Sequence, residues 1–238
     1  MNELVKDIWL TNILEKESYR YQPDLNATDK ADLSFLNNLR NDSFIYCKVP
    51  SNAVSLLDLL ENNGFRVVDT NVVFEKKLAP NPVNSVENVR FAICEDEEAV
   101  VKIAENNFIY SRFHLDTKIA DFKASQIKGE WVRNYFKKTR GDFLVVFQKN
   151  NELAGFCLLL DNKKNIVIDL ICVDKKFHGC GIASDMIRFV EKKFLGYESL
   201  IVGTQVANIP SVRLYEKNGF KLQNSYYVLH RHTRQGDK

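Results

Sequence analysis

The sequence predicts a mixed α/β fold, and three features of its second half lead to that prediction. Three strand-like runs follow one another between residues 143 and 173, and their short polar connections favour antiparallel hairpins. A glycine-containing loop then joins the last strand to an amphipathic helix. The chain closes with the order strand, helix, strand. Together these elements predict one layered α/β unit with a mixed sheet.

Each element follows from a local pattern. Before the three strands we expect a short strand at Val89–Cys94, and acidic residues in a first turn favour a helix over Glu95–Asn106. A largely helical segment is expected at Ile119–Lys138. The meander strands and the elements that follow are expected at Phe143–Gln148, Leu153–Leu160, Ile166–Val173, a helix from Ile182 to Phe194, Leu200–Val206, a helix at Ser211–Asn218 ended by Gly219, Phe220–Leu222 and Ser225–Arg231.

The first part of the chain resembles the last part. Leu59–Phe65 reads Leu-Leu-Glu-Asn-Asn-Gly-Phe and Leu214–Phe220 reads Leu-Tyr-Glu-Lys-Asn-Gly-Phe, each between two strand-like runs. We interpret this as a diverged half-repeat. The alternative is that the two helices share the same type of C-cap and are otherwise alike by chance. Two closely spaced prolines favour a linker between the copies. The expected organisation is a non-catalytic domain at 1–80, a linker at 81–86 and a catalytic domain at 87–238.

Composition limits the class of protein. With 45% hydrophobic and 27% charged residues, the chain has the composition of a soluble globular protein, and a net charge of +2 gives no electrostatic case for nucleic acid. The first residues do not read as a secretory signal, and no apolar run reaches the roughly 20 residues of a membrane helix. Five scattered cysteines argue against disulfides and a metal site. We therefore expect a cytoplasmic protein with no metal and no membrane partner.

The clearest chemical signal is the segment Val173–Ala183, which leaves a strand and opens the amphipathic helix. Gly179 and Gly181 permit close backbone approach to a ligand, and the unpaired N–H groups of a helix start attract anions. This predicts a pyrophosphate site. The segment is not a P-loop, because no Lys-Ser/Thr pair follows, and it lacks the third glycine of a dinucleotide-binding fingerprint.

This segment resembles the coenzyme A-binding motif of the GNAT superfamily of N-acetyltransferases, Gln/Arg-x-x-Gly-x-Gly/Ala. His178, Gly181 and Ala183 stand at its three defined positions, with His178 in place of the usual Gln or Arg. About thirty residues on, Asn208 and Leu214–Phe220 resemble the second GNAT motif. The resemblance covers about residues 87 to 231. It implies a GNAT fold with splayed central strands, preceded here by a smaller half-GNAT-like α/β domain.

The resemblance also implies acetyl-coenzyme A as co-substrate, bound between a strand ending at Val173 and one starting near Leu200. An acceptor amine would attack directly, a backbone N–H near Cys172 or Val173 would hold the oxyanion, and Tyr215 would be the general acid. For Tyr215 the alternative is a packing aromatic. The implied cofactor-binding residues are Ile171, Cys172, Val173, His178, Gly179, Cys180, Gly181, Ile182, Ala183 and Asn208.

The general base stays open. The candidates are Asp169, His114, Asp116 and His230, with deprotonation through water as an equal possibility. Cys172 and Cys180 have no His–Asp partner pattern, so we expect small apolar fillers rather than nucleophiles.

The acceptor is expected between the first two helices of the catalytic part. The expected substrate-binding residues are Arg112, Phe113, His114 and Asp169, because a guanidinium fits phosphate and aromatic rings can stack on a base or sugar. The alternative is that the aromatics are core. The layout, including the Ser-Arg-Phe stretch and a terminal Tyr-x-x-x-x-Arg-type strand at residues 226–231, is similar to the TDP-fucosamine acetyltransferase family. That similarity implies a nucleotide-linked 4-amino-4,6-dideoxyhexose for a surface polysaccharide.

Two other functions stay open. The chain could acetylate a different amine, such as a protein N-terminus, a polyamine or an antibiotic. It could also be a non-catalytic module that senses acyl-coenzyme A, which the intact Tyr215 argues against. A homodimer is a possible arrangement, with the N-terminal part as its scaffold.

Overall fold

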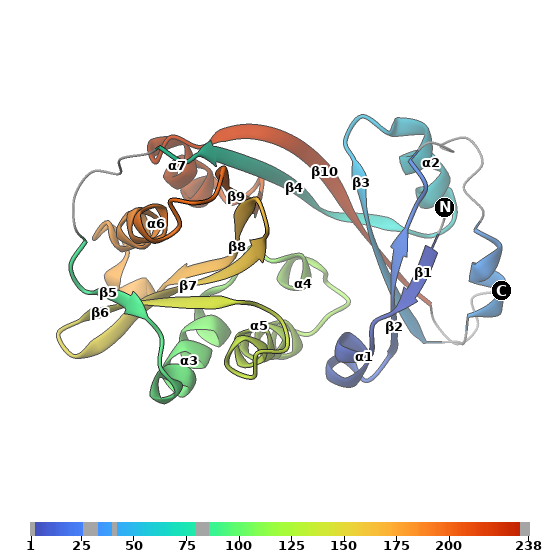
Figure 1. Cartoon of the computed structure of the whole chain (residues 1–238). Coiled ribbons are helices and arrows are strands. Elements are labelled where there is room, and N and C mark those ends of the chain that lie inside the picture. Colours follow the sequence, from blue (N-terminus) through green and yellow to red (C-terminus); the bar gives the residue numbers. More distant parts are fainter. Residues whose placement is uncertain (1–2, 26–32, 40–41, 80–85, 234–238) are drawn as a thin grey trace.

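A computed structural model describes residues 3–25, 33–39, 42–79 and 86–233 (Figure 1). All its strands join one ten-stranded mixed sheet in the order β1-β2-β3-β10-β4-β9-β8-β7-β6-β5. The strands are β1 (Glu3–Lys6), β2 (Glu17–Gln22), β3 (Ser43–Pro50), β4 (Arg66–Lys77), β5 (Val89–Phe91), β6 (Phe143–Lys149), β7 (Glu152–Asn162), β8 (Asn165–Val173), β9 (Ser199–Gln205) and β10 (Lys221–His232). The helices are α1 (Ile8–Leu14), α2 (Val54–Asn62), α3 (Glu97–Asn107), α4 (Arg112–Leu115), α5 (Asp121–Phe136), α6 (Ile182–Lys193) and α7 (Ile209–Lys217).

The expected meander is confirmed, because β6, β7 and β8 pair antiparallel in sequence. Expected and observed bounds of these strands and of α3, α5, α6 and α7 differ by at most two residues. One prediction was wrong: the two closing strands are a single strand, β10. A register shift against β4 between Leu222 and Asn224 replaces the expected break, so the strand bends without ending. The expected linker 81–86 lies, apart from Val86, outside the described residues.

Strands of the first and last parts of the chain alternate at the centre of the sheet. β10 lies between β3 and β4, and β4 lies between β10 and β9. Each strand–helix–strand unit thus places its last strand beside the first strand of the other unit. Figure 1 shows β4 and β10 as two long strands that bridge the halves of the molecule. The two units also end their helices alike, with Gly64 at φ 84° and Gly219 at φ 82°.

Helices cover both faces of this sheet and bury separate cores. On one face, α6 packs on β5 to β8 and α7 packs on β4, through one cluster that includes Phe74, Met186 and Tyr215. On the same face, α2 packs on β3 and β10 through Leu60 and Leu229. On the other face, α3 and α5 cover β6 to β8. A further cluster joins the two parts of the chain, since Leu10 and Phe44 contact Phe113 and residues of α5.

Candidate active site

The site begins where two neighbouring parallel strands part. β8 pairs with β9 from Asn165↔Ser199 as far as Ile168↔Val202, and the pairing stops there, although β8 continues to Val173 and β9 to Gln205. A β-bulge at Asp169, which has no partner between Ile168 and Leu170 in the β7 register, accompanies the parting. The last residues of β8 consequently keep β7 as a partner on one side and have no strand partner on their other edge. This is the splayed pair of strands that the resemblance to the GNAT superfamily implied.

A loop with an open backbone follows the free end of β8. Gly179 has φ 77° and Gly181 has φ 79°, and a Cβ built at either position would meet no atom within 4 Å. Gly181 is the N-cap of α6 and contributes no side-chain cap. Among the described residues, nothing accepts a hydrogen bond from the backbone N–H groups of Gly181, Ile182 or Ala183. The loop therefore presents unpaired donors at a helix N-terminus, which fits a pyrophosphate.

Short contacts hold this loop in place. The His178 Nε2 atom donates to the Val173 carbonyl at 3.0 Å, and the Asp174 N–H donates to the Ala154 carbonyl at 2.9 Å. His178 is thus engaged with its own loop. Asn208 caps α7 through a hydrogen bond from the Ser211 N–H at 3.2 Å. Cys180 is exposed, so the expectation of a buried filler was wrong for this residue, and all five cysteines are free.

Tyr215 reaches the sheet from α7. The residue is 2% exposed and contacts the rings of Phe74 and Phe220, with ring centroids 5.8 and 5.6 Å away. Burial, with a smaller effect of Cys157, raises the pKa of Tyr215. No described residue accepts a hydrogen bond from its hydroxyl. The phenol therefore stays protonated around neutral pH and has a proton to donate.

On the α5 side of the parting, Asp169 is held by three donors. Trp131 Nε1 and Tyr135 Oη donate to Asp169 Oδ2 at 2.7 and 2.8 Å, and Arg140 pairs with it at 2.9 Å. The Arg140 guanidinium also lies 3.9 Å from the Trp131 ring centroid. These contacts fix the position of the Asp169 carboxylate.

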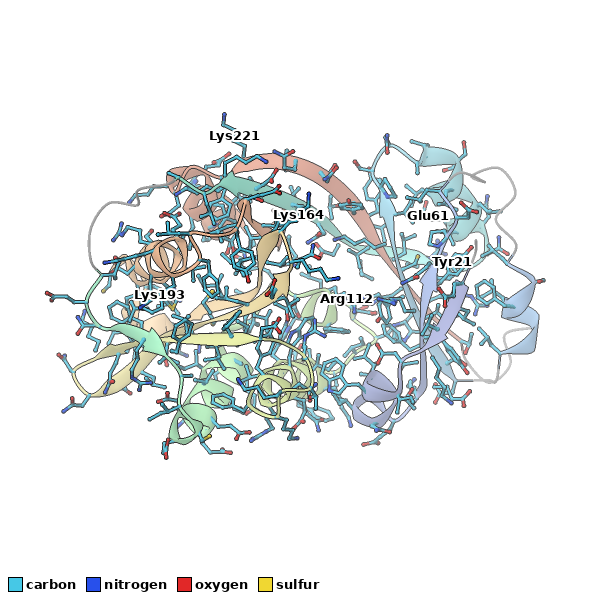
Figure 2. All side chains as sticks on the ribbon, viewed as in Figure 1. Tyr21, Glu61, Arg112, Lys164, Lys193 and Lys221 are labelled. Atoms are coloured by element: carbon cyan, nitrogen blue, oxygen red, sulfur yellow. The ribbon has the colours of Figure 1, made fainter. Side chains whose placement is uncertain are left out.

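Arg112 lies between the two halves of the molecule, where Figure 2 labels it. Its guanidinium is 4.0 Å from the Tyr46 ring centroid and 4.5 Å from that of Phe113. Phe113 itself is buried in the cluster that joins the halves. His114 Nδ1 pairs with Ser111 Oγ at 2.6 Å, and its Nε2 is buried without a partner among the described residues. Burial lowers the pKa of His114, which is therefore neutral at pH 7.

The first part of the chain contributes charged groups beside Arg112 that the sequence did not single out. Burial raises the pKa of Asp69 on β4, although hydrogen bonds from Gln205 and Thr70 oppose the rise. Burial also lowers the pKa of Lys48 on β3. Asp69 lies beside Gln205, the last residue of β9, because β4 pairs with β9 in the sheet. The half-repeat was the signal that could have indicated this proximity.

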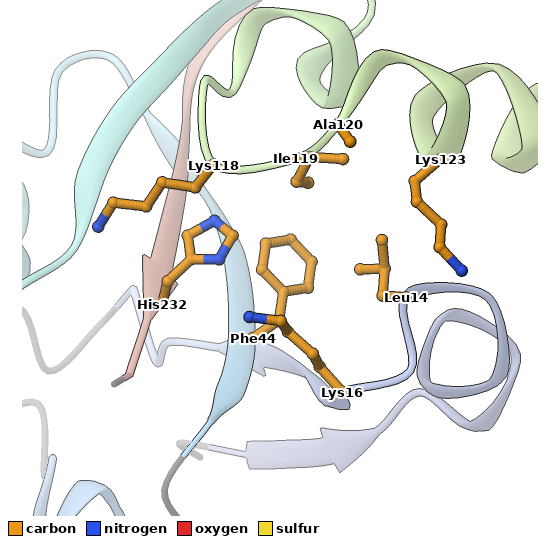
Figure 3. Close-up of a pocket in the computed structure, with 8 residues that line it drawn as sticks. All are labelled: Leu14, Lys16, Phe44, Lys118, Ile119, Ala120, Lys123 and His232. Carbon is orange, nitrogen blue, oxygen red and sulfur yellow. The ribbon is translucent and has the colours of Figure 1, made fainter. Parts of the chain in front are cut away.

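Two cavities lie away from the glycine loop, where the halves meet. One of about 170 Å³ is lined by Phe44, Lys118, Ile119 and His232 with neighbouring lysines (Figure 3). The other, of about 240 Å³, is lined by Asp116, His230 and His232 among other residues. Asp116 Oδ2 accepts from His230 Nδ1 at 2.6 Å and from His232 Nε2 at 2.7 Å. The ligand atoms of these three residues lie within 4.8 Å of one another, and their mutual hydrogen bonds already occupy the facing atoms.

This cluster predicts a loss of stability in mild acid. Burial lowers the pKa of His230 to about 4, against 6.5 ordinarily, so the folded state keeps this ring neutral while the unfolded state binds a proton. Stability from His230 is complete above pH 6.5 and falls by about 3 kcal/mol as the pH drops towards 4. Urea unfolding at several pH values should show this fall, and His230→Phe should reduce it. His178→Gln, which removes a histidine outside the cluster, is the control. An equal fall in the wild type and in His230→Phe would contradict the assignment.

Comparison with known proteins agrees with this geometry. The acetyltransferase (GNAT) family profile matches residues 106–220. Among solved structures, a functionally unknown conserved protein from Staphylococcus epidermidis has a TM-score of 0.65 at 15% identity, covering 94% of this chain and 88% of that one. A GCN5-related N-acetyltransferase from Sphaerobacter thermophilus has a TM-score of 0.58 at 18% identity, covering 85% and 64%. At these identities the structures show a shared fold.

The fold and the site thus agree with the class that this match indicates: residues 106–220 match the acetyltransferase (GNAT) family, which indicates an acyltransferase. The chain is also 31% identical over 137 residues to the spore coat polysaccharide biosynthesis protein SpsD of Bacillus subtilis. That match covers 57% of this chain and 47% of SpsD, so the chain spans about half the length of the curated relative it matches. Within the described residues, no helix is long and apolar enough to cross a membrane.

Proposed function

We propose that the chain transfers the acetyl group of acetyl-coenzyme A to the amine of a nucleotide-linked amino sugar, of the TDP-4-amino-4,6-dideoxyhexose type. The observation that carries the proposal is the parting of β8 from β9 after Ile168 and Val202, directly before the open glycine loop. The likeness to SpsD, a polysaccharide biosynthesis protein, supports a sugar as the acceptor. The charged groups around Arg112 supply polar partners for a nucleotide sugar.

The residues present fit acetyl-coenzyme A. The free edge of Ile171–Val173 can hydrogen-bond an extended pantetheine arm, and the unpaired N–H groups from Gly181 onward can hold the pyrophosphate. When bound, acetyl-coenzyme A supplies an activated acyl carbon and a sulfur leaving group. The acceptor nitrogen forms the new C–N bond while the C–S bond breaks, and the sulfur keeps the electron pair. Tyr215 then donates its phenolic proton to that sulfur.

Replacement of Gly181 tests the cofactor site. An alanine at φ 79° is strained by about 1–2 kcal/mol, so relief of the strain should move the N–H groups that hold the pyrophosphate. We expect Gly181→Ala to raise the Kd for coenzyme A about 5- to 30-fold by calorimetry. Gly196→Ala is the matched control, since a Cβ there also meets no atom within 4 Å and its φ is not positive. Equal affinity of both variants would contradict the assignment.

The acceptor is tested by release of free thiol from acetyl-coenzyme A with a panel of TDP- and UDP-linked amino sugars, with polyamines and peptides as controls. Turnover only with a nucleotide-linked amino sugar would support the proposal. Turnover only with polyamines or peptides would discard the sugar. Tight coenzyme A binding without any turnover would favour the non-catalytic sensor.

A further inference from the structure

A buried lysine without an acidic partner lies beside the acetyl-transfer site. Lys128, on α5, is 5% exposed. Its Nζ lies 4.7 Å from the Trp131 ring centroid and 4.8 Å from that of Phe108. Among the described residues, no carboxylate pairs with this amine and no group accepts a hydrogen bond from it. Such an amine is costly to bury in its charged form, because its charge is desolvated without a counter-ion.

Lys128 belongs to the face of the sheet where the acceptor would arrive. Trp131, against which its amine lies, donates to Asp169 at the bulge where β8 parts from β9. Phe108 and Trp131 pack against the same buried cluster as Cys172, the next-to-last residue of β8. The amine is therefore close to the end of β8, whose edge we assign to the pantetheine arm.

The charges around Lys128 favour its neutral form. Arg112 and His114 face it from α4, Arg140 from the loop after α5, and Asp169 and Cys172 from β8. Burial is the largest effect, the two guanidinium groups add to it, and Asp169 opposes it, so the pKa of Lys128 falls to about 7. Burial raises the pKa of Cys172 to about 12, against a smaller opposite effect of Lys128, so this thiol stays protonated.

We propose that Lys128 is the general base of the transfer, an inference that rests on the proposed function. The neutral Lys128 amine takes one proton from the acceptor ammonium, which leaves a lone pair on the acceptor nitrogen. That nitrogen attacks the acyl carbon, and Tyr215 donates its proton to the departing sulfur. The second proton lost by the nitrogen, on forming the amide, restores Tyr215. The first proton stays on Lys128 and passes to solvent after the products leave, so one proton is released per turnover.

The first test measures the protonation of Lys128 by NMR and does not require catalytic turnover. In the full-length protein labelled with ¹³C at lysine Cε, one signal should titrate near pH 7 and should be missing in Lys128→Arg. A titration of that signal near the ordinary value of about 10.4 would overturn the inference. This measurement on the wild-type protein stands even if a variant fails to fold.

The second test is kinetic. At saturating acceptor, the single-turnover rate of the wild type should fall about tenfold per pH unit below pH 7, because protonated Lys128 cannot accept a proton. Lys128→Met should lower the rate about 10²–10⁴-fold and remove this dependence. Lys128→Arg should be equally slow, since a guanidinium keeps its charge. Lys137→Met, exposed at the end of the same helix, should match the wild type.

The outcomes separate this inference from the proposed function. A nearly normal rate in Lys128→Arg would show that the site needs a cation, and would overturn the general-base role of Lys128. Turnover of another amine class by the wild type would remove the sugar substrate, and the same variants would then be compared on that amine. No turnover with any acceptor would contradict the proposed function, and the NMR titration would still accept or reject a neutral Lys128.

Discussion

Tyr215→Phe is expected to lower the single-turnover rate about 10²–10⁴-fold, the usual size of general acid–base effects. The reason is the position of the phenol: it is buried on the sheet, bonded to no described residue, and its pKa is raised by burial. Its proton is therefore retained until negative charge builds on the departing sulfur as the C–S bond breaks. Affinity for coenzyme A should change little, because the ring and its packing remain.

The control for this prediction is Tyr197→Phe. The Tyr197 hydroxyl donates to Asp161 at 2.7 Å, near the turn between β7 and β8 and far along these strands from the glycine loop. Loss of that hydroxyl should leave the rate within a few-fold of the wild type. A Tyr215→Phe enzyme as fast as the control would end the general-acid role and leave Tyr215 as a packing aromatic.

A fragment of residues 86–238 is expected to lose cooperative folding, although it holds the whole region matched by the GNAT family. Without β3 and β4, strand β10 has no neighbour and β9 keeps only its short pairing with β8. Leu229 and Phe220 would lose much of the cores that they share with the first part of the chain. Unpaired edges and exposed apolar side chains of this kind lead to aggregation.

Thermal unfolding followed by circular dichroism tests this prediction. The fragment should show no sharp transition, and co-expression with residues 1–79 should restore it. The matched control is the full chain cut at a protease site inserted within 80–85, which keeps both pieces. An isolated fragment that unfolds as sharply as the full chain and binds coenzyme A equally well would show that β4 and β10 are dispensable partners.

The elements that the sequence predicted correctly are those with a local signature. Apolar runs with short polar connections indicated β6 to β8, the amphipathic pattern indicated α6, and glycines marked the loop at 179–181 and the end of α7. The pairing of β10 with β3 and β4 has no such signature, because register between distant strands depends on the whole sheet. The prediction of a break near Asn224 was wrong for the same reason. Pairing with strands on both sides keeps β10 extended across a polar stretch.

The candidate site shows the same division. Tyr215 and the glycine loop stand in sequence motifs and were singled out as candidates, and their roles stay predictions. Lys128 and Asp69 were not, because a charged residue within an amphipathic pattern reads as solvent-exposed. Lys128 follows the buried Ile127, and only the rings of Phe108 and Trp131 around its amine reveal that it is buried as well. Asp169 was singled out, but its three donors come from α5 and the loop after it.

The alternation of β3, β10, β4 and β9 also has a consequence for biosynthesis. β3 leaves the ribosome long before its neighbour β10: the bonded residues Ser43 and Thr233 lie 190 positions apart. β3 must therefore wait, with one sheet edge unpaired, until β10 has been translated. At about 5–20 residues per second, that interval lasts on the order of 10–40 s, during which chaperones can bind the exposed edge. Completion of this sheet is thus expected long after β3 has been synthesised.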